Sequence, residues 1–199
     1  VSIHANPGGT RRVWLEMATR NAQFGAAQAL GSQATQETRL AALQQALDLP
    51  ENAQRIECFD VSHTLGEATV ASCVVYDKSA MQKGEYRHYN IAGIEPGDDY
   101  GAMREVLTRR YRKIVAGEGK VPDLVLIDGG KGQLAVASGV FAELGLNDVA
   151  LVAVAKGPER RPGQEQLIAA GSGEPLALGA DHPALHLIQQ IRDEAHRFA

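Results

Sequence analysis

The fold is decided by a stretch near the middle of the chain, Leu124-Val125-Leu126-Ile127-Asp128-Gly129-Gly130-Lys131-Gly132. Four apolar residues lead into a carboxylate, and three glycines interrupted by one lysine follow it. A short apolar run bounded by turn residues is typical of a strand buried on both faces of a parallel sheet. The sequence therefore predicts that Asp128 lies at the carboxyl end of a central strand, where open α/β sheets bind their ligands.

A second segment, residues 55–60, has a similar form and also ends in a carboxylate, Asp60. Either aspartate alone also fits an ordinary turn residue at a strand end. Two strands that each bring a carboxylate to one edge can hold a divalent cation for phosphate chemistry. The pair therefore predicts a site for Mg²⁺ or Mn²⁺.

Composition describes a globular protein of one good-sized domain: 199 residues, 44% of them hydrophobic and 22% charged, with a net charge of −4. No apolar run approaches the roughly 20 residues that cross a bilayer, and no secretory segment opens the chain, so we expect a cytoplasmic protein without membrane contact. Cys58 and Cys73 are the two cysteines, and their strand-like surroundings predict buried thiols. Basic residues cluster at 104–113 and 156–161. Such runs are usually solvated faces, but an acidic protein can bind DNA if they share one surface.

Hydrophobic periodicity and turn residues predict an α/β fold in the order βββαβαβα, preceded by a helical arm. We expect a loop at 1–12, and a helical region at 13–48 that Gly25, Gly31 and Ser32 bend or break, giving one long helix or two. The predicted strands are 55–60, 68–76, 86–91, 124–127 and 150–155, with a short hairpin at 166–169 and 175–178. The predicted helices are 97–115, 133–144 and a last one, capped by 181–183, that runs to the end of the chain.

This order is that of a ribonuclease-H-like mixed sheet flanked by helices, with the first strand central and the fourth beside it in parallel. Right-handed crossovers would then bring Asp60 and Asp128 to the same end of adjacent strands. We predict an arm at 1–52 and the ribonuclease-H-like domain at 53–199. Because the chain starts with Val1 rather than methionine, we expect it to be a fragment of a longer protein.

His196 in the last predicted helix is a candidate third metal ligand or proton-transfer group. A lone helical histidine is also typical of a surface residue that gains from the helix dipole. Asp193 and Glu194 compete as ligands, although a charged helix face is the simpler interpretation. Ser62 and His63 follow Asp60 and can hydrogen-bond metal ligands, or serve as plain turn residues.

The glycine-rich run does not match a phosphate-binding P-loop. That pattern needs four residues between its glycines and a Ser or Thr after the lysine, whereas Gly132 follows Lys131. Contact with a DNA phosphate backbone is the better hypothesis for the basic loop residues, since it adds affinity without sequence reading. The candidates, each of which also fits a solvated loop charge, are Lys131, Lys156, Arg160 and Arg161.

Five ordered motifs resemble the C-terminal half of the bacterial UvrC family, the dual-incision nuclease of the excinuclease ABC system of nucleotide excision repair. The likeness covers residues 12–199, essentially the whole chain. The motifs are Phe59-Asp60-Val61-Ser62-His63-Thr64, Gly97-Asp98-Asp99-Tyr100, Leu126-Ile127-Asp128-Gly129-Gly130-Lys131-Gly132-Gln133-Leu134, Val154-Ala155-Lys156-Gly157 and Arg192-Asp193-Glu194-Ala195-His196-Arg197-Phe198.

The resemblance implies a ribonuclease-H-like endonuclease whose Asp-Asp-His triad maps onto Asp60, Asp128 and His196. It implies a 5′ incision beside lesions with Mg²⁺ or Mn²⁺, on damaged double-stranded DNA. It also implies action with the excinuclease ABC protein UvrB, in a complex assembled with UvrA. The GIY-YIG domain, the UvrB-binding segment and the helix–hairpin–helix pair of that family are absent from these 199 residues. Two other hypotheses stay open: a non-catalytic nucleic-acid or protein-binding module, and a ribonuclease that cuts RNA–DNA hybrids.

Overall fold

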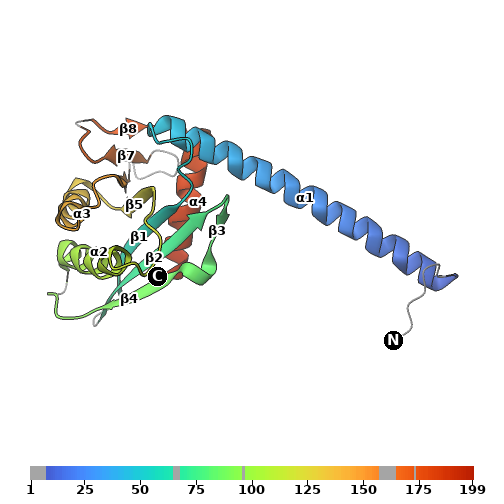
Figure 1. Cartoon of the computed structure of the whole chain (residues 1–199), viewed down its shortest axis with the longest axis horizontal. Coiled ribbons are helices and arrows are strands. Elements are labelled where there is room, and N and C mark those ends of the chain that lie inside the picture. The colour runs from blue at the N-terminus through green and yellow to red at the C-terminus, as the bar shows by residue number, and fades with distance from the viewer. Residues whose placement is uncertain (1–7, 65–67, 96, 157–164, 173) are drawn as a thin grey trace.

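The computed structural model describes residues 8–64, 68–95, 97–156, 165–172 and 174–199. Its centre is one mixed sheet with the strand order β3-β2-β1-β5-β6-β7-β8, in which β4 also pairs with β2. Helix α2 precedes β5, and helix α3 connects β5 to its parallel neighbour β6 (Figure 1). The strands are β1 (Ile56–Thr64), β2 (Ala68–Asp77), β3 (Ala80–Met81), β4 (Arg87–Ile91), β5 (Leu124–Asp128), β6 (Ala150–Ala155), β7 (Gln166–Ala169) and β8 (Leu176–Ala177).

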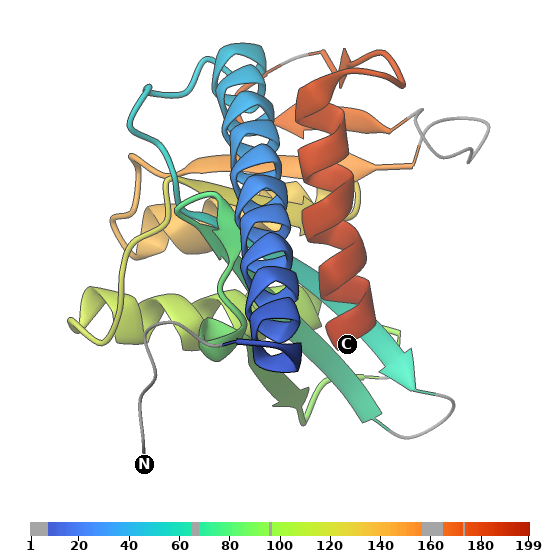
Figure 2. The same cartoon turned by 90° about the vertical axis from the view of Figure 1, so that its right-hand side faces the viewer.

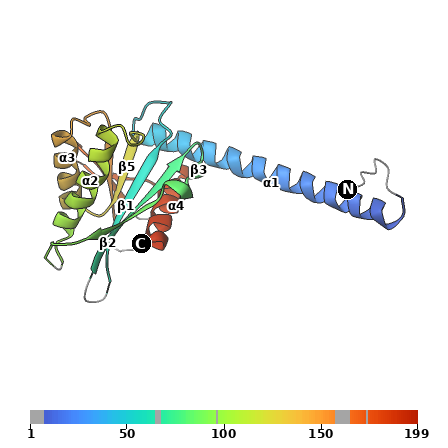
Figure 3. The same ribbon diagram turned by 60° about the horizontal axis from the view of Figure 1, so that its bottom comes forward.

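Four α-helices and a short 3-10 helix complete the described fold. They are α1 (Thr10–Ala46), η1 (Lys83–Glu85), α2 (Asp99–Val115), α3 (Lys131–Glu143) and α4 (Pro183–Phe198). Helices α2 and α3 cover one face of the sheet and α4 covers the other (Figure 3). None of the helices in the described part combines the length and the apolar character that crossing a bilayer requires.

Strand β1 lies at the centre of the sheet, antiparallel to β2 and parallel to β5, as predicted. Because side chains alternate along a strand, β1 feeds two cores. Phe59 packs with Ile127 under α2 and α3, while Cys58 packs with Leu126 under α4. The fold class predicted from the sequence, a ribonuclease-H-like mixed sheet flanked by helices, is confirmed.

One predicted strand limit was wrong, and one short strand was not predicted. Strand β1 does not end at Asp60 but continues to Thr64, because β2 keeps pairing with it as far as Thr64 opposite Ala68. Between the predicted strands 68–76 and 86–91 lies a further short strand, β3, which pairs with the end of β2. The hairpin predicted near residue 170 is present as β7 and β8.

Helix α1 is a single helix of 37 residues. It begins at Thr10, so the expected loop is wrong for residues 10–12, and neither Gly25 nor Gly31 breaks it. Its last turns pack beside α4 (Figure 2), where Gln36 Nε2 donates to Gln190 Oε1 at 2.9 Å, while its first turns extend far from the sheet (Figure 1). Only its C-terminal turns carry buried residues, Leu40 and Leu43.

Cys58 and Cys73 are free thiols, buried as predicted. They belong to the two different cores on opposite faces of the sheet. Burial raises the pKa of both thiols well above the ordinary value, because the thiolate would be desolvated. Both cysteines therefore behave as small apolar core residues.

Candidate active site

Asp60 and Asp128 lie side by side on the face of the sheet that α4 covers. The β1–β5 ladder pairs Phe59 with Ile127, so each aspartate is the next residue on its own parallel strand. Both carboxylates are largely enclosed, with 6% of the Asp60 side chain and 9% of the Asp128 side chain exposed. Parallel register thus brings two acids that are far apart in the sequence into one place.

His196 completes the cluster from the last turn of α4. Its Nδ1 lies 3.2 Å from Asp60 Oδ2 and its Nε2 lies 2.8 Å from Asp128 Oδ2. One ligand atom from each of the three residues lies within 4.8 Å of the others. The histidine side chain is 47% exposed, so the cluster is open to solvent on its side. The predicted convergence of these three groups is present, and their catalytic role stays a prediction.

The electrostatics of the cluster favour a cation. Burial is the largest cause that raises the pKa of Asp128, and the charge of Asp60 adds to it, while Arg192, His196 and Lys156 oppose the rise. Two desolvated carboxylates this close repel each other. A divalent cation would relieve that repulsion, and two oxygens with one imidazole nitrogen are donors that Mg²⁺ or Mn²⁺ accepts. The residues present therefore fit a divalent metal.

Two serines support the cluster. Ser62 lies two residues after Asp60 on the same face of β1, and its Oγ donates to Asp60 Oδ2 at 2.8 Å, so the predicted hydrogen bond to a candidate ligand is present. Ser72 pairs with Asp60 across the β1–β2 ladder. Its buried Oγ donates to the Ala195 carbonyl at 3.0 Å, which ties the last turn of α4 to the sheet next to Asp60.

His63 pairs with Thr69 in the β1–β2 ladder, and its side chain lies outside the described part of the structure. Among the competing carboxylates, Asp193 is exposed. Glu194 accepts from Tyr86 Oη at 3.1 Å and pairs with Arg197. Both acids therefore fit the simpler interpretation of a charged helix face. Among the described residues, the group that could hold a metal ion consists of Asp60, Asp128 and His196.

Two of the four residues predicted to contact the DNA backbone lie in the described part of the structure. Lys131 is exposed at the start of α3, three residues after Asp128. Lys156 is exposed directly after β6, which pairs with β5 up to Asp128 opposite Val154. Both lysines therefore lie at the edge of the sheet that carries the acids. Arg160 and Arg161 lie outside the described residues.

Arg192 belongs to the site although the sequence did not single it out. It lies one helical turn before His196, and its charge is the largest influence lowering the pKa of Asp128. Its Nη2 pairs with Glu165 Oε1 at 3.3 Å, whereas its Nε and Nη1 are buried and have no hydrogen-bond partner among the residues that the structure describes. The spacing of four residues from His196 was the available signal, because it places both side chains on one helix face.

A ribonuclease-H-like sheet with two adjacent aspartates and a helix-borne histidine defines the class: an α/β protein with a nuclease-type acidic site. The comparison with protein families then gives the particular family. The chain belongs to the UvrC RNase H endonuclease domain family, whose model matches residues 44–199.

Named relatives agree with this assignment. The chain is 64% identical over 199 residues to UvrABC system protein C of Methylobacillus flagellatus and 66% identical to that of Nitrosomonas europaea. In both cases the match covers 100% of this chain and 33% of the relative. The chain thus spans about a third of the length of these curated relatives.

Among solved structures, the catalytic domain of human endonuclease V is similar, with a TM-score of 0.43 and 17% identity over 79% of this chain and 86% of that one. Endonuclease V of Bacillus subtilis gives a TM-score of 0.40 and 14% identity over 80% of this chain and 89% of its own.

Proposed function

We propose that this chain hydrolyses a DNA phosphodiester at Asp60, Asp128 and His196, and that it makes the 5′ incision beside a lesion in nucleotide excision repair. The approach of one imidazole to two enclosed carboxylates, at 2.8 and 3.2 Å, is the observation that carries the proposal. The relatives' name, UvrABC system protein C, supports the repair context. We therefore propose damaged double-stranded DNA as substrate, and the excinuclease ABC protein UvrB, in a complex assembled with UvrA, as partner in the bacterial cytoplasm.

Asp60, Asp128 and a ring nitrogen of His196 would hold the metal, and Mg²⁺ or Mn²⁺ suits this mainly oxygen donor set. A divalent ion bound there supplies Lewis-acid stabilisation of a phosphodiester and lowers the pKa of a nearby water molecule. Ser62 orients Asp60 by donating to its Oδ2 at 2.8 Å. Arg192 favours the ionised form of Asp128, which is the form that binds a cation.

His196 has two candidate roles, and both need an unprotonated ring nitrogen. As a ligand it would complete the cation site, and as a base it would accept the proton of the attacking water. Its half-exposed ring lies on the open side of the cluster, where a DNA backbone can approach. Lys131 and Lys156 would contact phosphates there, together with Arg160 and Arg161 of the loop beyond the described residues. Such contacts give affinity without sequence preference.

The test is an incision assay on an end-labelled duplex with one bulky lesion, using a full-length protein that contains this chain together with UvrA and UvrB. Asp128→Asn is expected to reduce 5′ incision to background while DNA binding and folding persist. Asp181→Asn, which makes the same exchange at an exposed position, is expected to cut like the wild type. Substantial 5′ cutting by the Asp128 variant would refute the assignment.

Two further arms separate the rival functions. Wild-type DNA binding that persists in EDTA, without cutting in Mg²⁺ or Mn²⁺ under any partner condition, would instead indicate a non-catalytic binding module. An RNA–DNA hybrid tests the ribonuclease hypothesis, since a site that needs the 2′-hydroxyl would cut the hybrid and leave plain DNA intact.

A further inference from the structure

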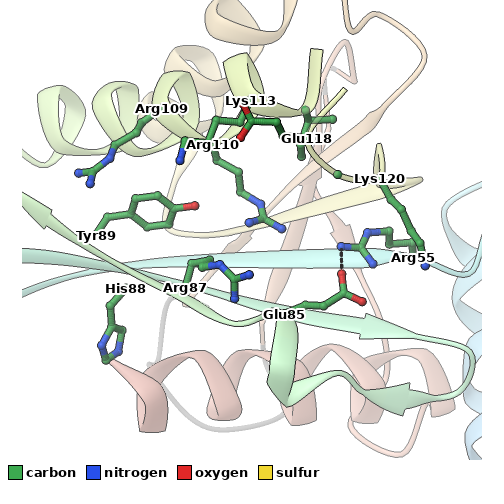
Figure 4. Close-up of a pocket in the computed structure, with 12 residues that line it drawn as sticks. Arg55, Glu85, Arg87, His88, Tyr89, Arg109, Arg110, Lys113, Glu118 and Lys120 are labelled. Carbon is green, nitrogen blue, oxygen red and sulfur yellow. Dashed lines mark hydrogen bonds and ion pairs between the residues drawn. The ribbon is translucent and has the colours of Figure 1, made fainter. Parts of the chain in front are cut away.

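A basic cavity of about 360 Å³ lies between α2 and the edge strand β4, on the opposite face of the sheet from the acid cluster (Figure 4). Two acids, Glu85 and Glu118, also line it. The chain as a whole carries a net charge of −4, so this excess of cations is local. The basic residues of its lining are chiefly Arg55, Arg87, Arg109, Arg110, Lys113 and Lys120.

The floor of the cavity is already neutralised by buried carboxylates. Arg110 binds Glu57 through two bonds, Nε to Oε2 at 2.5 Å and Nη2 to Oε1 at 2.6 Å. Arg55 reaches Glu57 at 3.1 Å and Glu85 at 2.6 Å. Glu57 also accepts from Tyr111 Oη at 2.9 Å. Arg55 and Arg110 are therefore held in place by carboxylates of the protein. Their positive charges are already compensated and do not contribute to binding an anionic ligand.

The rim is different, because its cations lack described carboxylate partners. Arg87 Nη1 donates to the backbone carbonyls of Gly84 and Tyr86. The Arg109 guanidinium lies over the Tyr89 ring, 5.4 Å from its centroid, which holds the side chain in place without neutralising it. Lys113 is exposed and forms no ion pair with the residues that the structure describes. Three uncompensated positive charges thus border one cavity.

The rim is within reach of a polymer bound at the acid cluster. Asp60, Ser72 and His88 are paired in one row across β1, β2 and β4, which spans about 10 Å at the usual strand spacing. The His88 ring stacks on Phe198, with ring centroids 4.1 Å apart, and so lies on the α4 face with the acids. Its neighbours Arg87 and Tyr89 point to the cavity on the other face, because side chains alternate along a strand. Since the cavity lies on the other face, a DNA strand must also pass around the edge strand β4, which takes more than the roughly three nucleotides, at about 3.4 Å each, that the row alone needs.

We propose that the cavity between α2 and β4 is a second nucleic-acid contact, which binds backbone phosphates of the DNA held at the acid cluster. The inference extends the proposed function, because it takes DNA as the bound polymer. Guanidinium and ammonium groups around a cavity suit phosphate oxygens. An acidic protein partner would need apolar contact area, and the apolar lining residues here, Tyr89 and Ile114, are themselves buried.

The test compares two double variants of the 199-residue chain by fluorescence anisotropy on a labelled 30-base-pair duplex in EDTA, at several KCl concentrations. Arg109→Ala with Lys113→Ala removes two rim charges from an exposed helix surface. Arg11→Ala with Arg20→Ala removes two exposed charges from the N-terminal part of α1, which extends away from α2 and β4 (Figure 1). Alanine favours helix at all four positions, so both proteins are expected to fold.

The rim variant is expected to bind about tenfold more weakly per lost contact at 50 mM salt, and the slope of log K against log salt should shrink by about 0.9 per phosphate contact. The α1 variant should match the wild type. Equal affinities of the wild type and both variants, equal losses in both variants, or an unchanged salt slope would each overturn the inference. Binding of inorganic phosphate is measured by calorimetry. If the rim variant loses phosphate binding but keeps its affinity for the duplex, the inference is also overturned, since the site would then bind a free anion.

Cutting in Mn²⁺ is scored separately on the wild type and on Asp128→Asn. A wild type that binds DNA through the rim but never cuts counts against the proposed function alone. A wild type that cuts while the rim variant keeps full duplex affinity counts against the cavity alone.

Discussion

Asp128→Asn offers a direct test of the metal site that needs no DNA. Without metal, this variant should be at least as stable as the wild type. Burial and the nearby Asp60 raise the pKa of Asp128 in the folded state, so its ionised carboxylate costs stability at neutral pH, above the unfolded-state pKa. A neutral amide removes that cost and the repulsion between the two acids.

With metal, the order reverses. A ligand that binds only the folded state stabilises it by about 2.7 kcal/mol when its concentration is 100 times its Kd. For a chain of 150–250 residues, about 1 kcal/mol shifts Tm by roughly 2–4 °C. The wild type should therefore gain roughly 5–10 °C in saturating Mn²⁺. The variant, left with Asp60 and His196, should lose most of this gain.

Thermal unfolding followed by circular dichroism, with EDTA or with Mn²⁺, measures both effects in one series. Asp181→Asn is the control, because it makes the same exchange at an exposed residue and should gain as much from Mn²⁺ as the wild type. An Asp128 variant that keeps the full Mn²⁺ gain would refute the metal site. So would a wild type that gains nothing at a Mn²⁺ concentration that supports cutting.

Three further substitutions test the architecture around the site. Glu57→Gln should cost about 3–5 kcal/mol in urea unfolding, because it leaves buried arginines without their carboxylate; a loss below about 1 kcal/mol would contradict this. Leu43→Ala should cost about 2–5 kcal/mol, whereas Phe24→Ala, at a side chain that is 72% exposed, should stay within about 0.5 kcal/mol; equal costs would mean that α1 is not anchored where the structure shows. Ser72→Ala should slow DNA cutting by about tenfold or more, as small misplacements of a catalytic group do, at a cost in stability of only about 0.5–1.5 kcal/mol. The control Ser138→Ala, which removes a similar bond to a helix carbonyl, should leave cutting unchanged.

Much of the sheet was predictable because its signals are local. The apolar run 124–127 needs burial on both faces, and its length suits a strand rather than a helix. A charged side chain directly after such a buried run costs folding free energy unless it has a partner. This made Asp128 a candidate site residue. The same reasoning identified Asp60.

Features that depend on a distant partner were not predictable. The sequence predicts a strand that ends at Asp60, but β2 continues to pair with β1 beyond it. Glu57 is buried within the α2–α3 face, and no local pattern announces that Arg110 and Tyr111, more than fifty residues later, will neutralise it. Arg192 was overlooked for the same reason, since its importance comes from its nearness to Asp128. Isolated glycines, such as Gly25, are tolerated in a helix, so they were weak evidence for a break.

The candidate site depends on two separate structural devices. Hydrogen bonding between β1 and β5 brings the two acids together, and the sheet cannot slip by one residue without moving both cores. The imidazole depends on the end of a helix, where a chain tends to fray. Ser72 counters this by bonding the Ala195 carbonyl from the strand position next to Asp60. Because that carbonyl also accepts from the Ala199 amide, the serine is not needed to satisfy it. We infer that its main contribution is to hold His196 at the acids, which would couple the position of the histidine to the sheet that carries them.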